Sequence, residues 1–437
     1  MRVLLVIALA VVLVGTAPSQ AYDFSAVDSL LADSLSRLGG GCELLLIRND
    51  SVLYHKAFGW YSIDTVVAIA SATKWLSAGV INSLVSDGRL SLDDTCGKFL
   101  PLYTGQKAQM TVRQLFSHTS GMPGSSDWEG AGSVTLAQAV DSMAFEPQRM
   151  PPGTDFHYGG VSMHVAGRIA EMAGGDSLAS GMMWDSLFQW RICRPLGITK
   201  IDYEGLGVTD NPRIAGGARA SAGDYGRYLQ MLLHRGWYGG QQVLDSAVVE
   251  SSFVDQTRGV PITYTPYQNY GWLDPTLPYT RYGIGCWRER VDSTGQVTEI
   301  ASQGAFGFSP WIDFRRNLVG VFSVRFLLRR AAATYWHLKQ LVRAVIDSGS
   351  VAVEQRATPH ASGITPSATV VRGSLLLAGG PSASSSSSPS WLLDIAGRKV
   401  MSLKPGENDV SHLAPGVYFV ISATGSPESP HRLLLVR

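Results

Sequence analysis

The sequence predicts an α+β protein, in which helices flank one antiparallel sheet built from both ends of a large domain. A helical subdomain is inserted into that domain, and a small all-β domain follows it. Strand-like apolar runs occur near the N-terminus and return only after residue 281, with helical segments and Gly/Pro-rich loops between them. Composition changes at Asp347, and short strand-like runs follow a serine-rich stretch. A chain of 437 residues, 45% of them hydrophobic, is long enough for two domains.

The first 21 residues have the pattern of a secretory signal peptide. Arg2 supplies the basic start, residues 3–14 are apolar, and Ser19-Gln20-Ala21 is a small-residue cleavage site. The apolar run is shorter than the roughly 20 residues that a membrane span needs. We therefore expect an exported protein whose mature chain begins near Tyr22, and an uncleaved anchor is the alternative.

Periodicity and turn residues predict the elements of the large domain, residues 22–348. A helix is expected over residues 24–38, because three glycines follow it. Strands at residues 42–47 and 52–57 enclose Asn49-Asp50-Ser51, which predicts a hairpin. A further helix is expected from Ser77 and ends at Asp87-Gly88-Arg89, and others are expected at residues 165–172, 224–233 and 331–346. Further strands are expected at residues 282–287, 307–312 and 318–324.

The C-terminal part is predicted to contain a linker, residues 349–370, and a small β-sandwich, residues 371–437. Short strand-like runs alternate there with turns such as Ala396-Gly397-Arg398. The segments at residues 394–400 and 413–419 resemble the C-terminal sorting domain of bacterial type IX secretion cargo. That resemblance implies a secretion machinery as partner and a secreted or cell-surface location. An accessory β-sandwich without a sorting role, on a periplasmic enzyme, is the alternative.

Charge and cysteine content exclude several classes of function. The net charge of +1 gives no electrostatic basis for binding nucleic acid. The four cysteines (Cys42, Cys96, Cys193, Cys286) lack the spacing of a metal site, so neither a metal nor another cofactor is expected. Disulfides in an exported protein and buried free thiols both fit these cysteines.

The tetrad Ser71-Ala72-Thr73-Lys74 carries the strongest chemical signal. It follows a strand-like apolar run and opens a segment with helical spacing. A serine at a helix start and a lysine three residues later lie on one face, one turn apart, so the amine can reach the hydroxyl. The helix N-terminus favours the negative charge of an alkoxide. Ser71 is thus a candidate nucleophile and Lys74 a candidate base.

Several further motifs follow in order, and together they resemble the serine β-lactamase-related family. They include His118-Thr119-Ser120-Gly121, the stretch from Pro152 to Gly160, Arg194-Pro195-Leu196-Gly197 and Ser302-Gln303-Gly304. The family comprises class C β-lactamases, D-Ala-D-Ala carboxypeptidases and related esterases and amide hydrolases. The resemblance spans about residues 24–346 and implies the β-lactamase/transpeptidase-like fold.

The resemblance also assigns further site residues. Tyr158 falls where the family has a Tyr-x-Asn motif facing the Ser/Lys pair, and Gly160 stands in place of the Asn. Ser302 or Gln303 falls where the family has a Lys or His on the edge strand, so that strand supplies no cation. Gly304 lets the backbone approach the substrate, and the N–H groups of Ala305 and Ser71 would form the oxyanion hole. His118 is expected to be a structural turn.

These residues predict a secreted serine hydrolase with an acyl-enzyme on Ser71. Without a strand cation, an esterase or amidase acting on a neutral small-molecule ester or amide is favoured. A D-Ala-D-Ala carboxypeptidase acting on a peptidoglycan-derived peptide, or a β-lactamase, is the first alternative, with Arg219 or Arg281 as a cation from another loop. A catalytically inactive binding protein on the same fold is the second. No Gly-x-Ser-x-Gly elbow occurs, which disfavours an α/β-hydrolase.

Overall fold

The computed structural model describes residues 22–175, 182–267 and 281–355, together with the C-terminal segments 369–371, 374–377, 390–393, 398–404, 406–413, 416–422 and 431–435. The predicted signal peptide lies outside the described residues. The chain divides into two compact units, Met1–Val353 and Glu354–Arg437. No helix among the described residues is both long enough and apolar enough to cross a membrane.

A six-stranded antiparallel sheet forms the centre of the first unit, and both ends of the unit contribute to it. Its strand order is β10-β11-β12-β13-β1-β2. The strands are β1 (Gly41–Arg48), β2 (Ser51–Gly59), β10 (Trp287–Val291), β11 (Val297–Ala301), β12 (Ser309–Asp313) and β13 (Leu318–Ser323). Pairing of β1 with β13, from Glu43 opposite Ser323 to Arg48 opposite Leu318, joins the two chain ends. The predicted fold class is therefore confirmed.

The hairpin of β1 and β2 forms as predicted. Asn49 and Asp50 have φ angles of 49° and 62°. Two consecutive residues with positive φ make the tight turn that fits the twist of paired strands, and Asn and Asp tolerate this conformation best among residues with a side chain.

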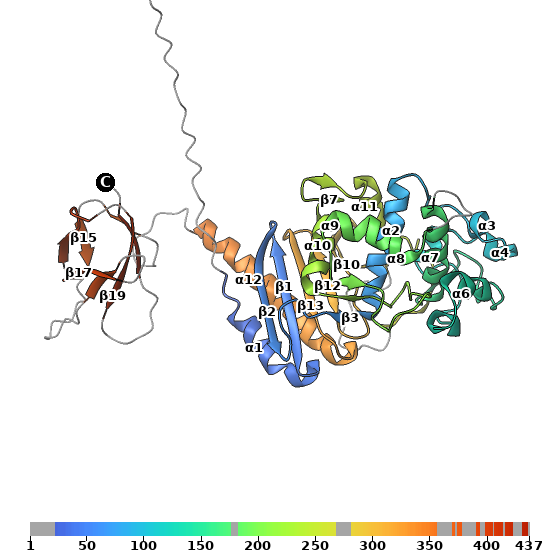
Figure 1. Cartoon of the computed structure of the whole chain (residues 1–437), viewed down its shortest axis with the longest axis horizontal. Helices are drawn as coiled ribbons and strands as arrows, with labels where there is room; N and C mark the ends of the chain where they lie inside the picture. The colour runs from blue at the N-terminus through green and yellow to red at the C-terminus, as the bar shows by residue number, and fades with distance from the viewer. Residues whose placement is uncertain are drawn as a thin grey trace, which may run out of the picture. The chain divides into compact units, whose positions relative to one another are not determined.

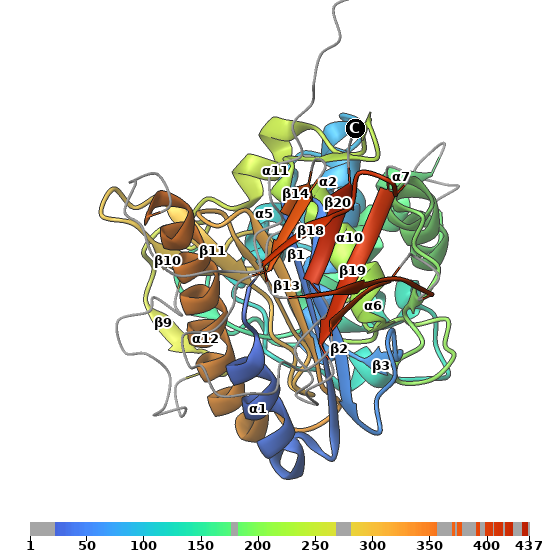
Figure 2. The same cartoon turned by 90° about the vertical axis from the view of Figure 1, so that its left-hand side faces the viewer.

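Helices cover both faces of the sheet. On one face, α1 (Ser25–Asp33) and α12 (Leu328–Gln355) lie side by side (Figure 2). They enclose a core that includes Val27, Leu44, Trp311 and Leu338. On the other face, α10 (Ala222–Leu233) packs against β1, β12 and β13. Figure 1 shows the remaining helices gathered beyond α10, away from α1.

The inserted helical subdomain surrounds α2 (Thr73–Ser86), which is buried along nearly its whole length. Its other helices are α3 (Cys96–Phe99), α4 (Gly105–Ala108), α5 (Val112–Phe116), η3 (Asp127–Gly130), α6 (Leu136–Met143), α7 (Val161–Gly174), α8 (Trp184–Phe188), η4 (Gln189–Cys193), α9 (Arg194–Leu196) and α11 (Ser246–Ser252). Short strand pairs connect them: β3 (Val67–Ala68) and β5 (Ile201–Asp202) with β6 (Arg219–Ala220), β4 (Phe156–His157) with β9 (Ile262–Tyr264), and β7 (Trp237–Tyr238) with β8 (Gln241–Gln242).

One predicted strand is wrong. Residues 282–286 form a turn, and β10 begins only at Trp287. The reason is Gly285, which has a φ angle of 77° and lies so close to α2 that a Cβ there would be 2.6 Å from the Lys74 carbonyl oxygen. This segment therefore packs against the start of α2, and apolar alternation could not show that contact.

The cysteines are buried and unpaired. Cys42, Cys96, Cys193 and Cys286 are all free thiols. Of the two alternatives for these residues, the structure has the buried thiols, and burial raises the pKa of each to about 12.

The second unit is all-β in its described segments. A five-stranded sheet has the order β14-β20-β19-β16-β17, and β15 pairs with β18. Their bounds are β14 (Thr369–Val371), β15 (Ser374–Leu377), β16 (Ser390–Leu393), β17 (Lys399–Leu403), β18 (Gly406–Asp409), β19 (Gly416–Ser422) and β20 (His431–Leu435). Helix α12 continues to Gln355, past the boundary expected at residue 348. Most of the predicted linker lies outside the described residues.

Candidate active site

Ser71 lies in the turn that leads into α2. A single 3-10 turn, η2 (Ala70–Ala72), precedes the helix, and Ala70 adopts a φ angle of 46°. Such a conformation is strained for a residue with a Cβ and persists only where its surroundings hold it. Here the Tyr225 hydroxyl donates to the Ala72 carbonyl oxygen at 2.8 Å, and the Ala218 N–H donates to the Thr73 hydroxyl at 3.1 Å.

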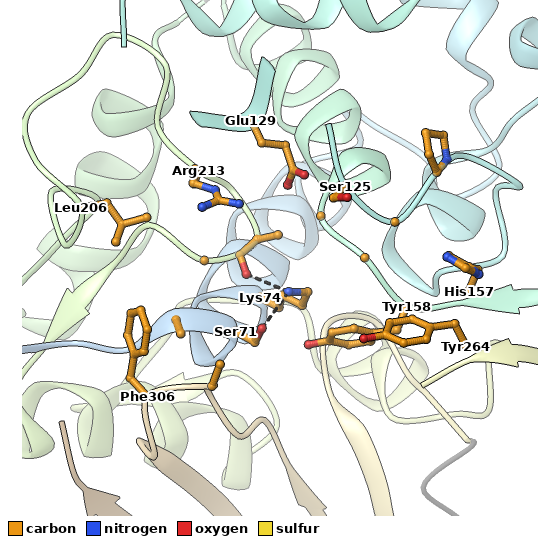
Figure 3. Close-up of a pocket in the computed structure, with 18 of the residues that line it drawn as sticks. Ser71, Lys74, Ser125, Glu129, His157, Tyr158, Leu206, Arg213, Tyr264 and Phe306 are labelled. Carbon is orange, nitrogen blue, oxygen red and sulfur yellow. Dashed lines mark hydrogen bonds between the residues drawn. The ribbon is translucent and has the colours of Figure 1, made fainter. Parts of the chain in front are cut away.

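Lys74 reaches Ser71 from the first turn of α2. Its Nζ donates to Ser71 Oγ at 3.1 Å and to the Ala215 carbonyl oxygen at 2.8 Å (Figure 3). Burial lowers the pKa of Lys74 to about 7, with a further decrease from the charge of Arg213, and Glu129 opposes the decrease. Near neutral pH a large share of these amines is therefore uncharged and able to accept a proton.

Tyr158 faces the same pair, as Figure 3 shows. Lys74 Nζ lies 4.7 Å from the centre of its ring, and the Tyr158 N–H donates to the Tyr264 carbonyl oxygen at 3.1 Å. Burial raises the pKa of Tyr158 well above its usual value, and the interaction of its hydroxyl with Ser71 opposes the rise. The phenol therefore stays protonated at neutral pH and can donate a hydrogen bond.

His118 holds Tyr158 in place. The centre of the His118 ring lies 4.4 Å from that of the Tyr158 ring. Trp287 also stacks on Tyr158, with the ring centres 5.3 Å apart. Burial lowers the pKa of His118 well below its usual value, so the ring is neutral. His118 is expected from the sequence to be part of a structural turn, and its contact with Tyr158 makes it a positioning residue.

The residues after β11 divide between the cavity and the interior. Ala305 lines the cavity beside Ser71, as expected of an oxyanion-hole residue. Gly304 packs on the turn before α2, where a Cβ would lie 1.9 Å from the Ile69 carbonyl oxygen. Ser302 and Gln303 are buried and are not among the lining residues; Gln303 accepts a hydrogen bond from the Tyr267 hydroxyl at 2.8 Å.

These side chains open into a cavity of about 750 Å³. Its walls come from α2, the loop containing η3, the Tyr158 segment, the loop before β6, β9 and the turn after β11. Besides the residues already named, the lining includes Ser125, Glu129, Arg149, His157, Leu206, Arg213, Tyr264 and Phe306. Glu129 and Arg213 were not identified as cavity residues from the sequence.

Glu129 is a buried acid that points into the cavity (Figure 3). One carboxylate oxygen, Oε2, accepts the Ser126 N–H at 3.2 Å. The other, Oε1, has no hydrogen-bond partner among the described residues. Burial raises the pKa of Glu129, and the charge of Arg213 opposes this rise.

Arg213 brings a cation to the cavity from the loop before β6. Among the described residues no carboxylate lies within ion-pair distance of its guanidinium, and Figure 3 shows it beside Glu129 above Ser71 and Lys74. Neither arginine suggested by the sequence takes this place. Arg219 pairs instead with Asp202 and Glu204, each at 2.9 Å, and Arg281 is not a lining residue.

One cluster outside the cavity has the residue types of a metal site. Ligand atoms of Glu43, His55 and Asp64 lie within 4.8 Å of one another. Glu43 Oε1 is bonded to His55 Nε2 and to the Asp64 N–H, both at 2.7 Å, and Lys200 Nζ lies 3.6 Å from Asp64. These contacts tie β1 and β2 to the following loop.

An antiparallel sheet flanked by helices, with a serine and a lysine one turn apart at the start of a buried helix, defines the β-lactamase/transpeptidase fold. The chain belongs to the family described as Beta-lactamase, which matches residues 36–339.

Individual relatives agree with this assignment. A crystal structure of a candidate β-lactamase from Bacteroides dorei DSM 17855 is 32% identical, with a TM-score of 0.65, and the match covers 75% of this chain and all of that one. Penicillin-binding protein 4 of Amycolatopsis lactamdurans is 33% identical over 140 residues, 31% of this chain and 35% of that protein. Protein flp of Staphylococcus aureus (strain NCTC 8325 / PS 47) is 30% identical over 148 residues, 30% of this chain and 29% of that protein. The match thus spans about a third of these two proteins.

Proposed function

We propose that the protein is a serine hydrolase that cleaves a small-molecule ester or amide through an acyl-enzyme on Ser71. The observation that carries this proposal is the Lys74 amine, which lies 3.1 Å from Ser71 Oγ and has a pKa of about 7. An amine with this pKa, within hydrogen-bond distance of a hydroxyl, is suited to general-base catalysis at neutral pH.

The proposed reaction has two halves. Neutral Lys74 takes the Ser71 proton as Oγ attacks the substrate carbonyl carbon, and the N–H groups of Ser71 and Ala305 stabilise the oxyanion. The alcohol or amine then leaves with a proton supplied through the Tyr158 hydroxyl, which Lys74 replenishes. Water next attacks the acyl group with Lys74 again as the base, which releases the acid and restores Ser71.

Two structural relatives have names that agree with this reaction class. One is EstCE1, described as a hydrolase with promiscuous acyltransferase activity, 16% identical with a TM-score of 0.57. The other is a D-stereospecific amidohydrolase from Streptomyces sp., 18% identical with a TM-score of 0.53. At such identities these relatives support the fold alone, so the reaction rests on the site itself.

Covalent labelling distinguishes the candidate functions. We expect a fluorophosphonate to label the mature chain and Ser71→Ala to abolish labelling. Labelling by a fluorescent penicillin as well would indicate a penicillin-recognising enzyme. An unlabelled, correctly folded protein would contradict the proposal and favour the inactive binding protein.

Arg213 favours a second candidate, a D-Ala-D-Ala carboxypeptidase or β-lactamase. The substrates of both carry a carboxylate, and Arg213 is a cavity cation without a carboxylate partner among the described residues. If it binds that group, Arg213→Gln should lower penicillin acylation about 10-fold or more, the worth of a charge-assisted hydrogen bond, and leave p-nitrophenyl acetate hydrolysis nearly unchanged. Equal effects on both substrates would contradict this candidate.

We further propose that the protein is exported and that the C-terminal unit acts as the sorting signal. Support comes from the signal-peptide pattern of residues 1–21 and from the motif resemblance at residues 394–400 and 413–419.

A further inference from the structure

The Glu129 carboxylate fills the space in the cavity wall that a side chain at position 160 would need. A Cβ added to Gly160 would lie 1.8 Å from Glu129 Oε1, so no larger residue fits at position 160 while Glu129 keeps its place. In the Tyr-x-Asn motif of the family, the residue at this position is an Asn. Here a carboxylate fills that space instead of an amide.

This exchange changes the hydrogen bonds that the wall can make. An amide both donates and accepts, whereas an ionised carboxylate only accepts. Glu129 Oε2 is engaged with the Ser126 N–H, while Oε1, on a side chain only 3% exposed, has no partner among the described residues. Oε1 is not one of the buried unpartnered atoms, so it is open to the cavity, where a ligand that supplies a donor can bond to it in place of solvent.

Burial raises the pKa of Glu129, whereas the charge of Arg213 favours the ionised form of this acceptor. Arg213 lies near enough to oppose the effect of burial on Glu129. Lys74 is the other basic group that acts on the carboxylate, and its amine is uncharged in the form proposed to act as the base. Glu129 is therefore an acid that points into the cavity containing Ser71 and Lys74, without a counter-ion bonded to it among the described residues.

We infer that Glu129 selects substrates whose acyl group carries an ammonium next to the carbonyl, namely amino-acid esters or amides with a free α-amine. This inference rests on the proposed acyl-enzyme function and narrows its substrate class. An acyl group without the amine would leave Oε1 unpartnered, and an acyl group with a carboxylate there would meet repulsion.

The test is a binding measurement on the Ser71→Ala protein, which cannot turn the ligands over. Alanine p-nitroanilide, in both enantiomers, is compared with propionyl p-nitroanilide, which differs only in lacking the amine. Calorimetry at about pH 7 keeps most of the α-amine protonated while a large share of Lys74 is uncharged. We expect the preferred alanine enantiomer to bind about 10-fold or more tightly than the propionyl compound.

Glu129→Gln is the matched variant, because glutamine keeps the size of the side chain and an acceptor for the Ser126 N–H. In the Ser71→Ala background it should bring the two affinities within about threefold of each other. Glu146→Gln is the control: Glu146 is half-buried, accepts a hydrogen bond from the Ser126 hydroxyl, lies near Glu129 and is not a lining residue of the cavity. It should leave the preference intact.

Equal binding of the alanine and propionyl compounds by the parent protein would overturn the inference, and that comparison needs no change at position 129. Equal weakening of both ligands by Glu129→Gln would also overturn it, because it would show only a structural role. Failure of the proposed reaction is detected separately, as absence of fluorophosphonate labelling at Ser71 in the wild-type protein.

Discussion

Burial acts in opposite directions on the two titratable groups beside Ser71. It lowers the pKa of the Lys74 amine to about 7 and raises the pKa of the Tyr158 phenol. Near neutral pH the amine is thus able to accept a proton while the phenol still holds one. Two groups whose pKa values are driven apart in this way suit the proposed roles of base and proton donor.

The first prediction concerns pH. Only neutral Lys74 can accept the Ser71 proton, so kcat/KM should rise with pH through about 7 and level off above it. Lys74→Ala and Tyr158→Phe should each lower kcat/KM by roughly 10²–10⁴. The measurement is the rate of p-nitrophenyl acetate hydrolysis between pH 5.5 and 9, and a pH-independent rate across that range would contradict the role of Lys74.

The same pKa shift predicts a stability effect. The pKa of Lys74 is about 7 in the folded protein against an ordinary 10.5, so between these values the unfolded chain binds more protons than the folded protein. Stability from this group therefore rises with pH from about 7 to 10.5. Lys74→Met removes the free-energy cost of burying the lysine amine, although it also removes the hydrogen bonds that the amine makes. We expect it to raise the free energy of unfolding by about 1–3 kcal/mol at pH 7.

Urea denaturation at pH 7 and pH 10 checks this expectation. The stability gained by Lys74→Met over wild type should shrink at the higher pH. A variant less stable than wild type at pH 7, or a difference that does not change with pH, would contradict the account of Lys74 burial.

Among the site residues, the sequence could predict those whose position is determined by local spacing or by the order of motifs. One helical turn brings Lys74 to Ser71, and the order of motifs indicates Tyr158. Glu129 and Arg213 belong to loops about 80 residues apart, and nothing local marks either one as a cavity residue. Their role follows only from how the helical subdomain brings the loops together.

At the scale of elements, close approaches of glycine backbone assemble the site. Gly304, after β11, packs on the turn that carries Ser71, and Gly285, before β10, packs on the start of α2. The apolar alternation around Gly285 predicted a strand, and the structure has a turn there. A tertiary contact between backbones determines the conformation of this segment, and residue patterns do not reveal such a contact.

Gly304→Ala tests the importance of this approach. Because a Cβ there would lie 1.9 Å from the Ile69 carbonyl oxygen, the turn or the strand end must move, and Ser71 with it. We expect kcat/KM for p-nitrophenyl acetate to fall at least about 10²-fold, since a shift of about 1 Å in a reacting group has that effect.

Gly132→Ala is the control for this variant. Position 132 has open space around it and no unusual φ angle. The activity and melting temperature of the Gly132→Ala protein should therefore match those of the wild type. A Gly304→Ala protein with wild-type kcat/KM would show that the approach does not position Ser71.

At the scale of the whole molecule, α12 closes the first unit. Lys339 is buried and contacts both Glu289 and Glu299, and Arg343 donates two hydrogen bonds to Glu299 at 2.8 and 2.6 Å. Arg316 binds Asp347, at 2.9 and 2.7 Å. These contacts fasten the helix to the sheet as far as residue 347, and Ile346 is the last buried apolar residue among the helix residues whose burial the structure describes.

A protein consisting of residues 22–350 should therefore fold and keep full esterase activity, since it retains every one of these contacts. Its kcat/KM should match that of the full-length protein, and its melting temperature should match that of the first unit within the full-length protein. Insolubility or loss of activity would show that the C-terminal unit is part of the catalytic fold.

The same truncation tests the proposed sorting role. In the native host the full-length protein should reach the medium or the cell surface, and the form ending at residue 350 should remain in the periplasm. Cell fractionation distinguishes the two locations. Arrival of the truncated form outside the cell would refute a sorting function for the C-terminal unit.

The acyl-enzyme on Ser71 is the central claim, and mass spectrometry of the quenched reaction tests it most directly. The protein is mixed with p-nitrophenyl acetate, quenched in acid within the first turnovers, digested and mapped. We predict one acetyl group on the peptide containing Ser71, and neither adduct nor turnover above background in Ser71→Ala. Hydrolysis at the wild-type rate by Ser71→Ala, or an acetyl group located on another residue during turnover, would contradict the mechanism.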